Sequence, residues 1–202
     1  RVVSGLERQH STSEYQYSIK NYVRWSGSLD MGEDTTDAIE VSEESALVVD
    51  ATHRGGSNFI VHLIDLKTGN KKHLINEQGS FDGRIIAHVT PGQYVFNVVY
   101  DREYTLEPTD INPGETHEPP VRMSDHDYAV LPVELGSPVR VELAAQTDSN
   151  VILHMKNALG ETVDHIFNEL GPGEFATTIT TEGLALFYLQ MVDEWELSIE
   201  SF

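Results

Sequence analysis

The sequence contains no cysteine and only five lysines among its 202 residues. Without cysteine, disulfide frameworks and thiolate metal sites are excluded. No apolar run reaches the length of a membrane-spanning helix, about 18 residues or more. Only 13 basic residues face 33 acidic ones, which gives a formal net charge of −20. That imbalance argues against nucleic acid as a partner, because phosphates bind basic surfaces, and against an anionic membrane surface.

Hydrophobic residues nevertheless make up 39% of the chain, so the composition is not that of a disordered acidic tail. The acidic residues are spread along the chain, which predicts an acidic surface on all sides. Such a surface repels itself in dilute buffer, whereas a Debye length of about 3 Å at 1 M salt removes the penalty. High acidity with few lysines resembles proteins of salt-in halophilic archaea and their viruses. The alternative is an ordinary acidic protein.

The chain contains an internal repeat, with the second copy offset from the first by 91 or 92 residues. The matching pairs are Ser57–Leu63 with Ser149–Met155, His73–Gly79 with His165–Gly171, and Glu103–Glu107 with Glu194–Ser198. Matches in the same order over most of each half indicate a duplication.

The repeat divides the chain into four parts. Residues 1–22 precede the first copy and include a strand-like alternation at Tyr15–Ile19. The first copy covers residues 23–107 and the second covers residues 121–202. Between them, residues 108–120 contain four prolines and no apolar periodicity, which predicts a stiff, extended linker.

Within each copy the apolar residues alternate with a period of two or form short runs. The runs of the first copy, rich in Val, Ile, Phe and Tyr, are Ala46–Asp50, Phe59–Ile64, Arg84–Val89 and Tyr94–Tyr100. Glycine-rich and polar turns separate them, as between strands. Seven or eight short strands per copy predict an all-β fold of two tandem antiparallel β-sandwiches, similar to jelly rolls.

The last predicted hairpin of the first copy combines Thr90–Val98 with Tyr104–Leu106. It resembles the closing P-G-x-Y-x-x-x-V…Y-T-L pattern of pre-peptidase C-terminal-type domains, over about 20 residues per copy. In the second copy, Glu182-Gly183 and Trp195–Leu197 remain of this pattern. The resemblance implies an extracellular accessory module that has no chemistry of its own.

The residues themselves point away from catalysis. No G-x-S-x-G elbow and no phosphate-binding glycine loop occurs, and Gly55-Gly56 precedes a predicted strand rather than a helix. Acid pairs are uninformative in so acidic a chain. We therefore expect a protein that is not an enzyme and that needs no cofactor, with calcium as the one alternative.

Two histidines recur in both copies: His62 with His154, and His73 with His165. A hairpin turning at Lys67–Asn70 would place residue 62 opposite residue 75, and His62 and His73 as diagonal neighbours on one face. A metal site built on each pair is one hypothesis, although a third ligand is not evident. The alternative is that both histidines are polar positions kept through duplication on a half-exposed face, or are packed at a contact between the domains.

The acidic stretch from Asp30 to Asp37 is the calcium candidate, with Asp30, Asp34 and Asp37 as ligands. Calcium takes six to eight oxygens from a flexible loop, but the spacing here is not that of an EF-hand. Solvated acidic residues are the alternative.

Asn58 recurs as Asn150, and Asn76-Glu77 recurs as Asn168-Glu169. Together with Phe59 or Tyr94 they could line a carbohydrate groove. The alternative is that each asparagine bonds its own turn backbone.

These observations predict a structural or adhesive surface protein: a spacer, a filament subunit or a virion appendage, located outside the cell or on the cell surface of a halophile. Its partners would be proteins, including copies of itself. Tyr15, Tyr17 and Ile19 would supply an assembly strand that completes a neighbour's sheet. A carbohydrate- or metal-binding accessory module of a larger secreted enzyme is the alternative function, and an intracellular halophilic scaffold is a third.

Overall fold

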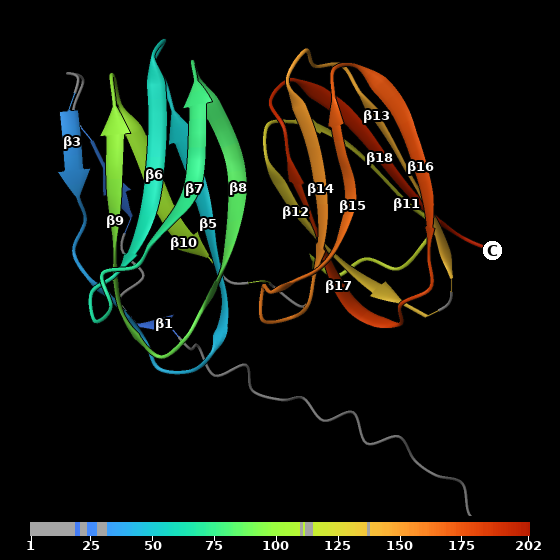
Figure 1. Cartoon of the computed structure of the whole chain (residues 1–202), viewed down its shortest axis with the longest axis horizontal. Coiled ribbons are helices and arrows are strands. Elements are labelled where there is room, and N and C mark those ends of the chain that lie inside the picture. The colour runs from blue at the N-terminus through green and yellow to red at the C-terminus, as the bar shows by residue number, and fades with distance from the viewer. Residues whose placement is uncertain (1–18, 21–23, 28–31, 110, 112–114, 137) are drawn as a thin grey trace, which may run out of the picture.

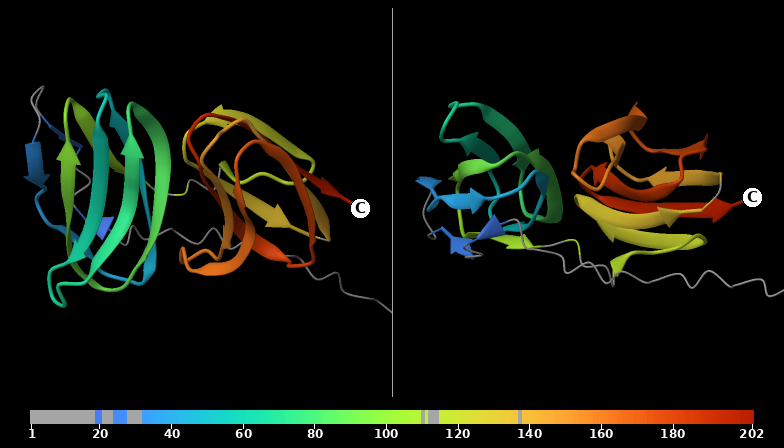
Figure 2. Two further views of the ribbon diagram at one scale, coloured as in Figure 1. Left: turned by 45° about the horizontal axis from the view of Figure 1, so that its top comes forward. Right: turned by 90° about the horizontal axis from the view of Figure 1, so that it is seen from below.

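The computed structural model describes residues 19–20, 24–27, 32–109, 111, 115–136 and 138–202 (Figure 1). The protein is all-β, as predicted, with four antiparallel sheets that form two sandwiches. Figure 2 shows the two sandwiches side by side along the long axis of the molecule.

One sheet of the first sandwich has the order β1-β4-β9-β6-β7, with β3 also pairing with β9. Its strands are β1 (Ile19–Lys20), β3 (Gly32–Thr35), β4 (Ile39–Val41), β6 (Asn58–Asp65), β7 (Lys71–Gln78) and β9 (Gly92–Tyr100). The facing sheet has the order β2-β10-β5-β8. Its strands are β2 (Trp25–Ser26), β5 (Ser45–His53), β8 (Phe81–Val89) and β10 (Tyr104–Thr109).

The second sandwich repeats this arrangement. One sheet, β11-β18-β13-β16, consists of β11 (Val121–His126), β13 (Val139–Ala145), β16 (Gly173–Ile179) and β18 (Glu194–Ser201). The other, β12-β17-β14-β15, consists of β12 (Ala129–Leu135), β14 (Asn150–Lys156), β15 (Thr162–Leu170) and β17 (Gly183–Gln190). If β3 and β4 count as one interrupted strand and β1 is left out as an additional edge strand, both sandwiches have the strand orders 1-8-3-6 and 2-7-4-5. These are the orders of a jelly roll.

Alternating side chains explain why each strand lies in a sandwich. In β6, Phe59, Val61 and Leu63 are buried in the core of the first sandwich, and Val151, Leu153 and Met155 of β14 take the same positions in the second. The intervening residues lie on the opposite face of each sheet.

Several residues of the predicted linker contact the sandwiches. Pro108 and Thr109 belong to β10 and pair with Val49 and Val48. Ile111 packs against the first core. The His117 backbone forms an isolated bridge with Val133. This segment is therefore docked on both sandwiches.

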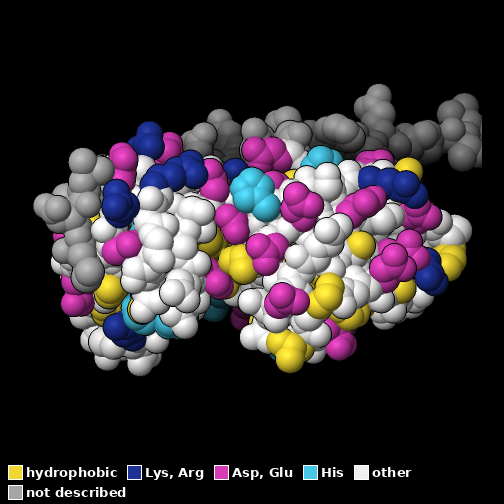
Figure 3. Space-filling view, turned by 90° about the horizontal axis from the view of Figure 1, so that it is seen from above, with side chains coloured by type: hydrophobic (Ala, Val, Ile, Leu, Met, Phe, Trp, Pro, Cys, Tyr) yellow, Lys and Arg dark blue, Asp and Glu magenta, His cyan; other side chains and the backbone are white. Residues whose placement is uncertain are grey.

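No helix in the described part of the chain is long and apolar enough to cross a membrane. Acidic side chains are distributed over both sandwiches on the face shown in Figure 3, as the composition predicted for the surface.

Candidate functional site

The two sandwiches pack against each other through one face of a sheet of the second sandwich. Along β17, Ala185 and Phe187 face the core of their own sandwich, whereas Leu186 and Tyr188 belong to the buried cluster of the first. Tyr128 and Val130 also belong to the first cluster. The sheet containing β12 and β17 is therefore covered on both faces. The sequence offered a contact between the domains only as an alternative explanation of the repeated histidines, and it did not predict the residues that make this inter-sandwich contact.

Tyr128 and its neighbour Asp127 make the polar part of the inter-sandwich contact. The Tyr128 hydroxyl donates to Oε1 of Glu77 at 2.5 Å, and its carbonyl accepts from the Arg84 backbone N–H at 2.8 Å. A carboxylate oxygen of Asp127 accepts from the backbone N–H of Asp82, also at 2.8 Å. Backbone and side-chain bonds thus both fix how the second sandwich sits on β8.

Gly83 lies at the tightest point of this contact. A Cβ atom at this position would lie 2.8 Å from the Tyr128 carbonyl oxygen and 2.9 Å from its nitrogen, closer than real Cβ contacts allow. The strand pairing of β13 and β16 shows that Phe175, paired with Leu143, occupies the equivalent position in the second sandwich. The docking surface is therefore particular to the first copy.

Beside this contact lies an inter-sandwich groove of about 570 Å³. Three histidines, two lysines and one glutamate line it: Lys72, His73, His88, His154, Lys156 and Glu161. Tyr188 and Gln190 of β17 also line it. These residues come from both copies, so the groove exists only because the sandwiches are docked. Because it brings imidazole, ammonium, carboxylate and aromatic side chains together, we take it as the candidate binding site.

Lys156 is a buried cation at the wall of the groove. Its ammonium donates to the Thr162 hydroxyl at 2.9 Å and to the Gly160 carbonyl at 3.2 Å. It also lies 5.6 Å from the centre of the Tyr188 ring, within cation–π range. Burial lowers the pKa of Lys156, and the nearby charge of Lys72 lowers it further. The hydrogen bonds fix Lys156 on the turn between β14 and β15.

The repeated histidines form two matching pairs on adjacent strands. The His62 and His73 ring centres are 4.7 Å apart, and Nδ1 of His73 lies 3.1 Å from Nε2 of His62. The His154 and His165 ring centres are 4.6 Å apart, and Nε2 of His154 lies 3.1 Å from Oε1 of Gln190. The structure therefore brings each predicted pair together.

The predicted register of these pairs was wrong. His62 lies directly opposite His73, and Val61 lies opposite Ile75, because the pairing slips by one residue between Val61 and His62. β14 slips at the same position, between Leu153 and His154. Such a bulge cannot be seen in an alternating pattern, which assumes an unbroken ladder.

Two of these histidines, His62 on β6 and His154 on β14, are biased toward the neutral form. Burial lowers the pKa of His62, and the charges of Lys71 and His73 add to this effect. Burial likewise lowers the pKa of His154, together with His165 and Lys156. Neutral imidazole is the metal-binding form, so each histidine pair can supply two nitrogen ligands. Within the described part of the chain, however, no third metal-ligating side chain lies close to either pair.

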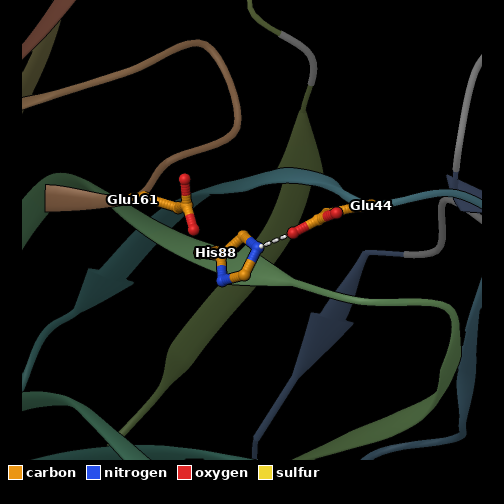
Figure 4. Close-up of side chains that lie close together, drawn as sticks. All are labelled: Glu44, His88 and Glu161. Carbon is orange, nitrogen blue, oxygen red and sulfur yellow. Dashed lines mark hydrogen bonds and ion pairs between the residues drawn. The ribbon is translucent and has the colours of Figure 1, made fainter.

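A different group of three side chains has the composition of a metal site: Glu44, His88 and Glu161, with one ligand atom from each lying within 4.8 Å of the others. Figure 4 shows His88 between the two carboxylates. Nε2 of His88 lies 2.8 Å from Oε1 of Glu44. Glu44 and His88 belong to the first sandwich and Glu161 to the second, so this cluster spans the inter-sandwich groove.

Of the predicted calcium ligands, Asp30 lies outside the described residues. Asp34 accepts hydrogen bonds from the Tyr100 hydroxyl at 2.9 Å and the Tyr104 hydroxyl at 3.2 Å. Asp37 is exposed, and the structure groups neither Asp34 nor Asp37 with other metal-ligating side chains in its described part. Asp34 therefore has a structural role in binding two tyrosines.

The predicted carbohydrate residues do not share a surface. Phe59 is fully buried and stacks on His53, with ring centres 4.7 Å apart. Tyr94 is also buried, and its hydroxyl donates to the Thr90 carbonyl at 2.9 Å. Asn58 and Asn150 are exposed at the starts of β6 and β14. The prediction was wrong for Phe59 and Tyr94 because core-facing strand residues and surface aromatics look alike in a sequence.

The predicted assembly strand is only partly described. Ile19 pairs with Val41 of the same chain, so β1 completes its own sheet rather than a neighbour's. Tyr15 and Tyr17 lie outside the described residues.

Sequence reasoning missed Glu44, His88, Lys156 and Glu161. His88 and Lys156 have no like residue at the equivalent positions of the other copy, Thr180 and Ile64. A search for repeated residues cannot find positions that only one copy carries. Their proximity depends on the inter-sandwich contact, which has no local signature.

The fold and contacts define the class: a tandem jelly-roll protein with docked sandwiches. No protein-family model and no curated protein matches the chain. Among solved structures, the exported protein XepA of PBSX is similar at 10% identity, over 90% of this chain and 86% of that one, with a TM-score of 0.32.

Two further solved structures give lower scores. An isomalto-dextranase of Arthrobacter globiformis T6, in complex with panose, is 17% identical over 86% of this chain and 36% of that one, with a TM-score of 0.25. A conserved protein of unknown function from Pseudomonas aeruginosa PAO1, PA5104, is 13% identical over 84% and 81%, with a TM-score of 0.23. Similarity at this level carries no argument about function.

Proposed function

We propose that this protein is a non-catalytic structural or adhesive surface protein, adapted to high salt, in which two jelly rolls act as one rigid spacer. The observation that supports this proposal best is the inter-sandwich contact. Tandem domains joined only by a linker move independently by default. Here the contact buries three side chains between the sandwiches: Leu186, Tyr188 and Tyr128. A backbone hydrogen bond from Arg84 to Tyr128 also joins the two sandwiches.

Among structural roles, the spacer is favoured over a filament built by repeating the same contact. A third sandwich docked on the second in the same way would meet Phe175 where the existing contact has Gly83. The benzyl side chain would occupy the space that the Tyr128 backbone needs. A filament subunit or virion appendage would therefore require a different surface for assembly.

Small-angle X-ray scattering in molar KCl tests the rigid spacer. The expected profile fits one fixed arrangement of the two sandwiches, and it stays unchanged when the protein is diluted. A profile that requires a broad range of inter-sandwich angles would refute the proposal. Light scattering on the same samples measures self-association, which a filament subunit needs and a spacer does not.

The second candidate is a carbohydrate- or metal-binding accessory module of a larger secreted enzyme, in line with the pre-peptidase C-terminal-type resemblance. The observation that favours it is the groove of about 570 Å³ lined by histidines, Lys156 and Tyr188. A glycan array in high salt separates the two functions, because only an accessory module of the carbohydrate-binding kind predicts saturable glycan binding.

A further inference from the structure

We infer that Glu44, His88 and Glu161 bind a divalent transition-metal ion of the zinc type, which joins the two sandwiches across the inter-sandwich groove. The three side chains come from the turn before β5, from β8 and from the turn before β15. This inference goes beyond the proposed function and does not depend on it.

The geometry suits an ion of this size. In tetrahedral coordination with bonds of about 2.0–2.1 Å, neighbouring ligand atoms lie roughly 3.3 Å apart. The Nε2 atom of His88 and Oε1 of Glu44 are 2.8 Å apart, and one ligand atom from each of the three side chains lies within 4.8 Å of the other two. Small side-chain rotations therefore bring all three atoms to bonding distance. Three protein ligands leave the fourth position for water.

Two hydrogen bonds with Asn157 orient Glu161. Oε2 of Glu161 accepts from the Asn157 amide at 2.8 Å, and Oδ1 of Asn157 accepts from the Glu161 backbone N–H at 3.0 Å. Such a partner outside the ligand shell orients a ligating carboxylate and leaves its other oxygen for the metal.

The turn that carries Glu161 is also docked directly beside His88. Gly160 has a φ of 80°, and a Cβ there would lie 3.1 Å from Cβ of Ala46 and 3.3 Å from the backbone nitrogen of His88. Glycine thus permits both the turn conformation and the close approach. This close approach of Gly160 brings the neighbouring carboxylate of Glu161, in the second copy, to His88 of the first copy.

The ligand chemistry selects the class of metal. One imidazole and two carboxylates suit zinc and its first-row neighbours, whereas calcium and magnesium prefer oxygen ligands alone. Two ammonium groups oppose the ion: Lys72 donates to the His88 carbonyl, and Lys156 lines the same groove. They partly offset the two carboxylate charges, so we expect micromolar rather than nanomolar affinity.

The test is a titration of the full chain, freed of metal with EDTA, with Co²⁺ as the spectroscopic probe and Zn²⁺ as its competitor. We expect one Co²⁺ per chain, visible d–d absorption, and displacement by Zn²⁺. Glu161→Gln keeps an amide oxygen and nitrogen near Asn157 but removes the charge, and it should weaken binding at least about tenfold. His88→Gln and Glu44→Gln should weaken it similarly.

His73→Gln is the matched control, because His73 lines the same groove without belonging to the cluster. It should leave Co²⁺ affinity unchanged. Zn²⁺ should also raise the Tm of the wild type but not of Glu161→Gln, because a ligand that binds only the folded state stabilises it. Absence of saturable binding up to about 1 mM Co²⁺ would overturn the inference. So would a loss of binding in His73→Gln or in His165→Gln that matches the loss in Glu161→Gln.

Discussion

Tyr128 contributes to the inter-sandwich contact with its ring, its hydroxyl and its backbone. The ring meets Phe81 edge-on, with centres 5.2 Å apart, and the hydroxyl binds the half-buried carboxylate of Glu77. Burial raises the pKa of Glu77; the hydrogen bond from Tyr128 opposes this shift and the charge of Asp127 adds to it. A single residue therefore links apolar packing between the sandwiches to the protonation of a carboxyl group.

The raised pKa of Glu77 predicts how stability changes with pH. Burial also raises the pKa of Asp127. A carboxyl whose pKa is higher in the folded state binds its proton more tightly there, so its contribution to stability is full below the unfolded pKa and is lost as pH rises through the folded pKa. We expect Glu77→Gln to reduce this loss above pH 4, because the neutral amide still accepts from Tyr128. Urea unfolding from pH 4 to pH 8 measures the effect.

Glu134→Gln, on an exposed carboxylate of β12, is the control for the loss of one charge. If both variants change the pH profile equally, the effect comes from net charge and not from the buried position of Glu77.

Gly83 gives a second prediction at the residue scale. Gly83→Val would place side-chain atoms on the Tyr128 backbone and displace the second sandwich from β8. We expect a loss of about 1–3 kcal/mol in the free energy of unfolding, as for overpacked cores, and a wider range of inter-sandwich angles in scattering. Gly56→Ala is the control, because a Cβ there meets no atom within 4 Å. Unchanged scattering from Gly83→Val would contradict the role of this glycine.

At the scale of strands, the sequence predicted the features that both copies share, and it did not predict the contacts that only one copy makes. Phe59–Leu63 and Val151–Met155 alternate in the same phase, and this pattern is enough to predict two sandwiches of one kind. β17 lacks the usual alternation of apolar and polar residues, because its outward-facing Leu186 and Tyr188 are buried against the first sandwich. An apolar run on both faces of a strand indicates a second covered face, but it does not say what covers it.

The candidate site was predictable only in part for the same reason. The histidine pairs lie within one hairpin each, so their proximity follows from local pairing. The Glu44–His88–Glu161 cluster joins segments of different copies, and no periodicity connects such segments.

β1 provides a prediction about self-association. Ile19–Lys20 pairs with Glu40 and Val41 at the outer edge of β4. Deleting residues 1–20 should expose this edge, and an unpaired edge strand is a template for pairing with another chain. We expect concentration-dependent association that the full chain lacks, measured by light scattering. Deleting residues 1–18 retains β1 and is the control. If deleting residues 1–20 instead abolishes an existing assembly, the N-terminal segment acts between chains, as a donated strand would.

At the scale of the whole molecule, charge opposes the compactness that the contacts create. A net charge of −20 surrounds two cores, and the inter-sandwich contact itself places Glu77, Asp82 and Asp127 close together. Mutual repulsion in dilute buffer therefore weakens both the fold and the docking of the sandwiches.

We accordingly expect the Tm to rise between about 0.1 M and about 2 M KCl, because the screening length falls from about 10 Å to below 3 Å. A gain of about 3 kcal/mol would raise the Tm of a chain of this size by roughly 6–12 °C.

Replacing three exposed glutamates, Glu40, Glu134 and Glu182, by glutamine removes three charges without touching the core. This variant should start with a higher Tm at low salt and gain less from KCl. Equal slopes for the two proteins would mean that KCl strengthens apolar burial instead of screening charge, and the acidic surface would then not be an adaptation of stability to salt.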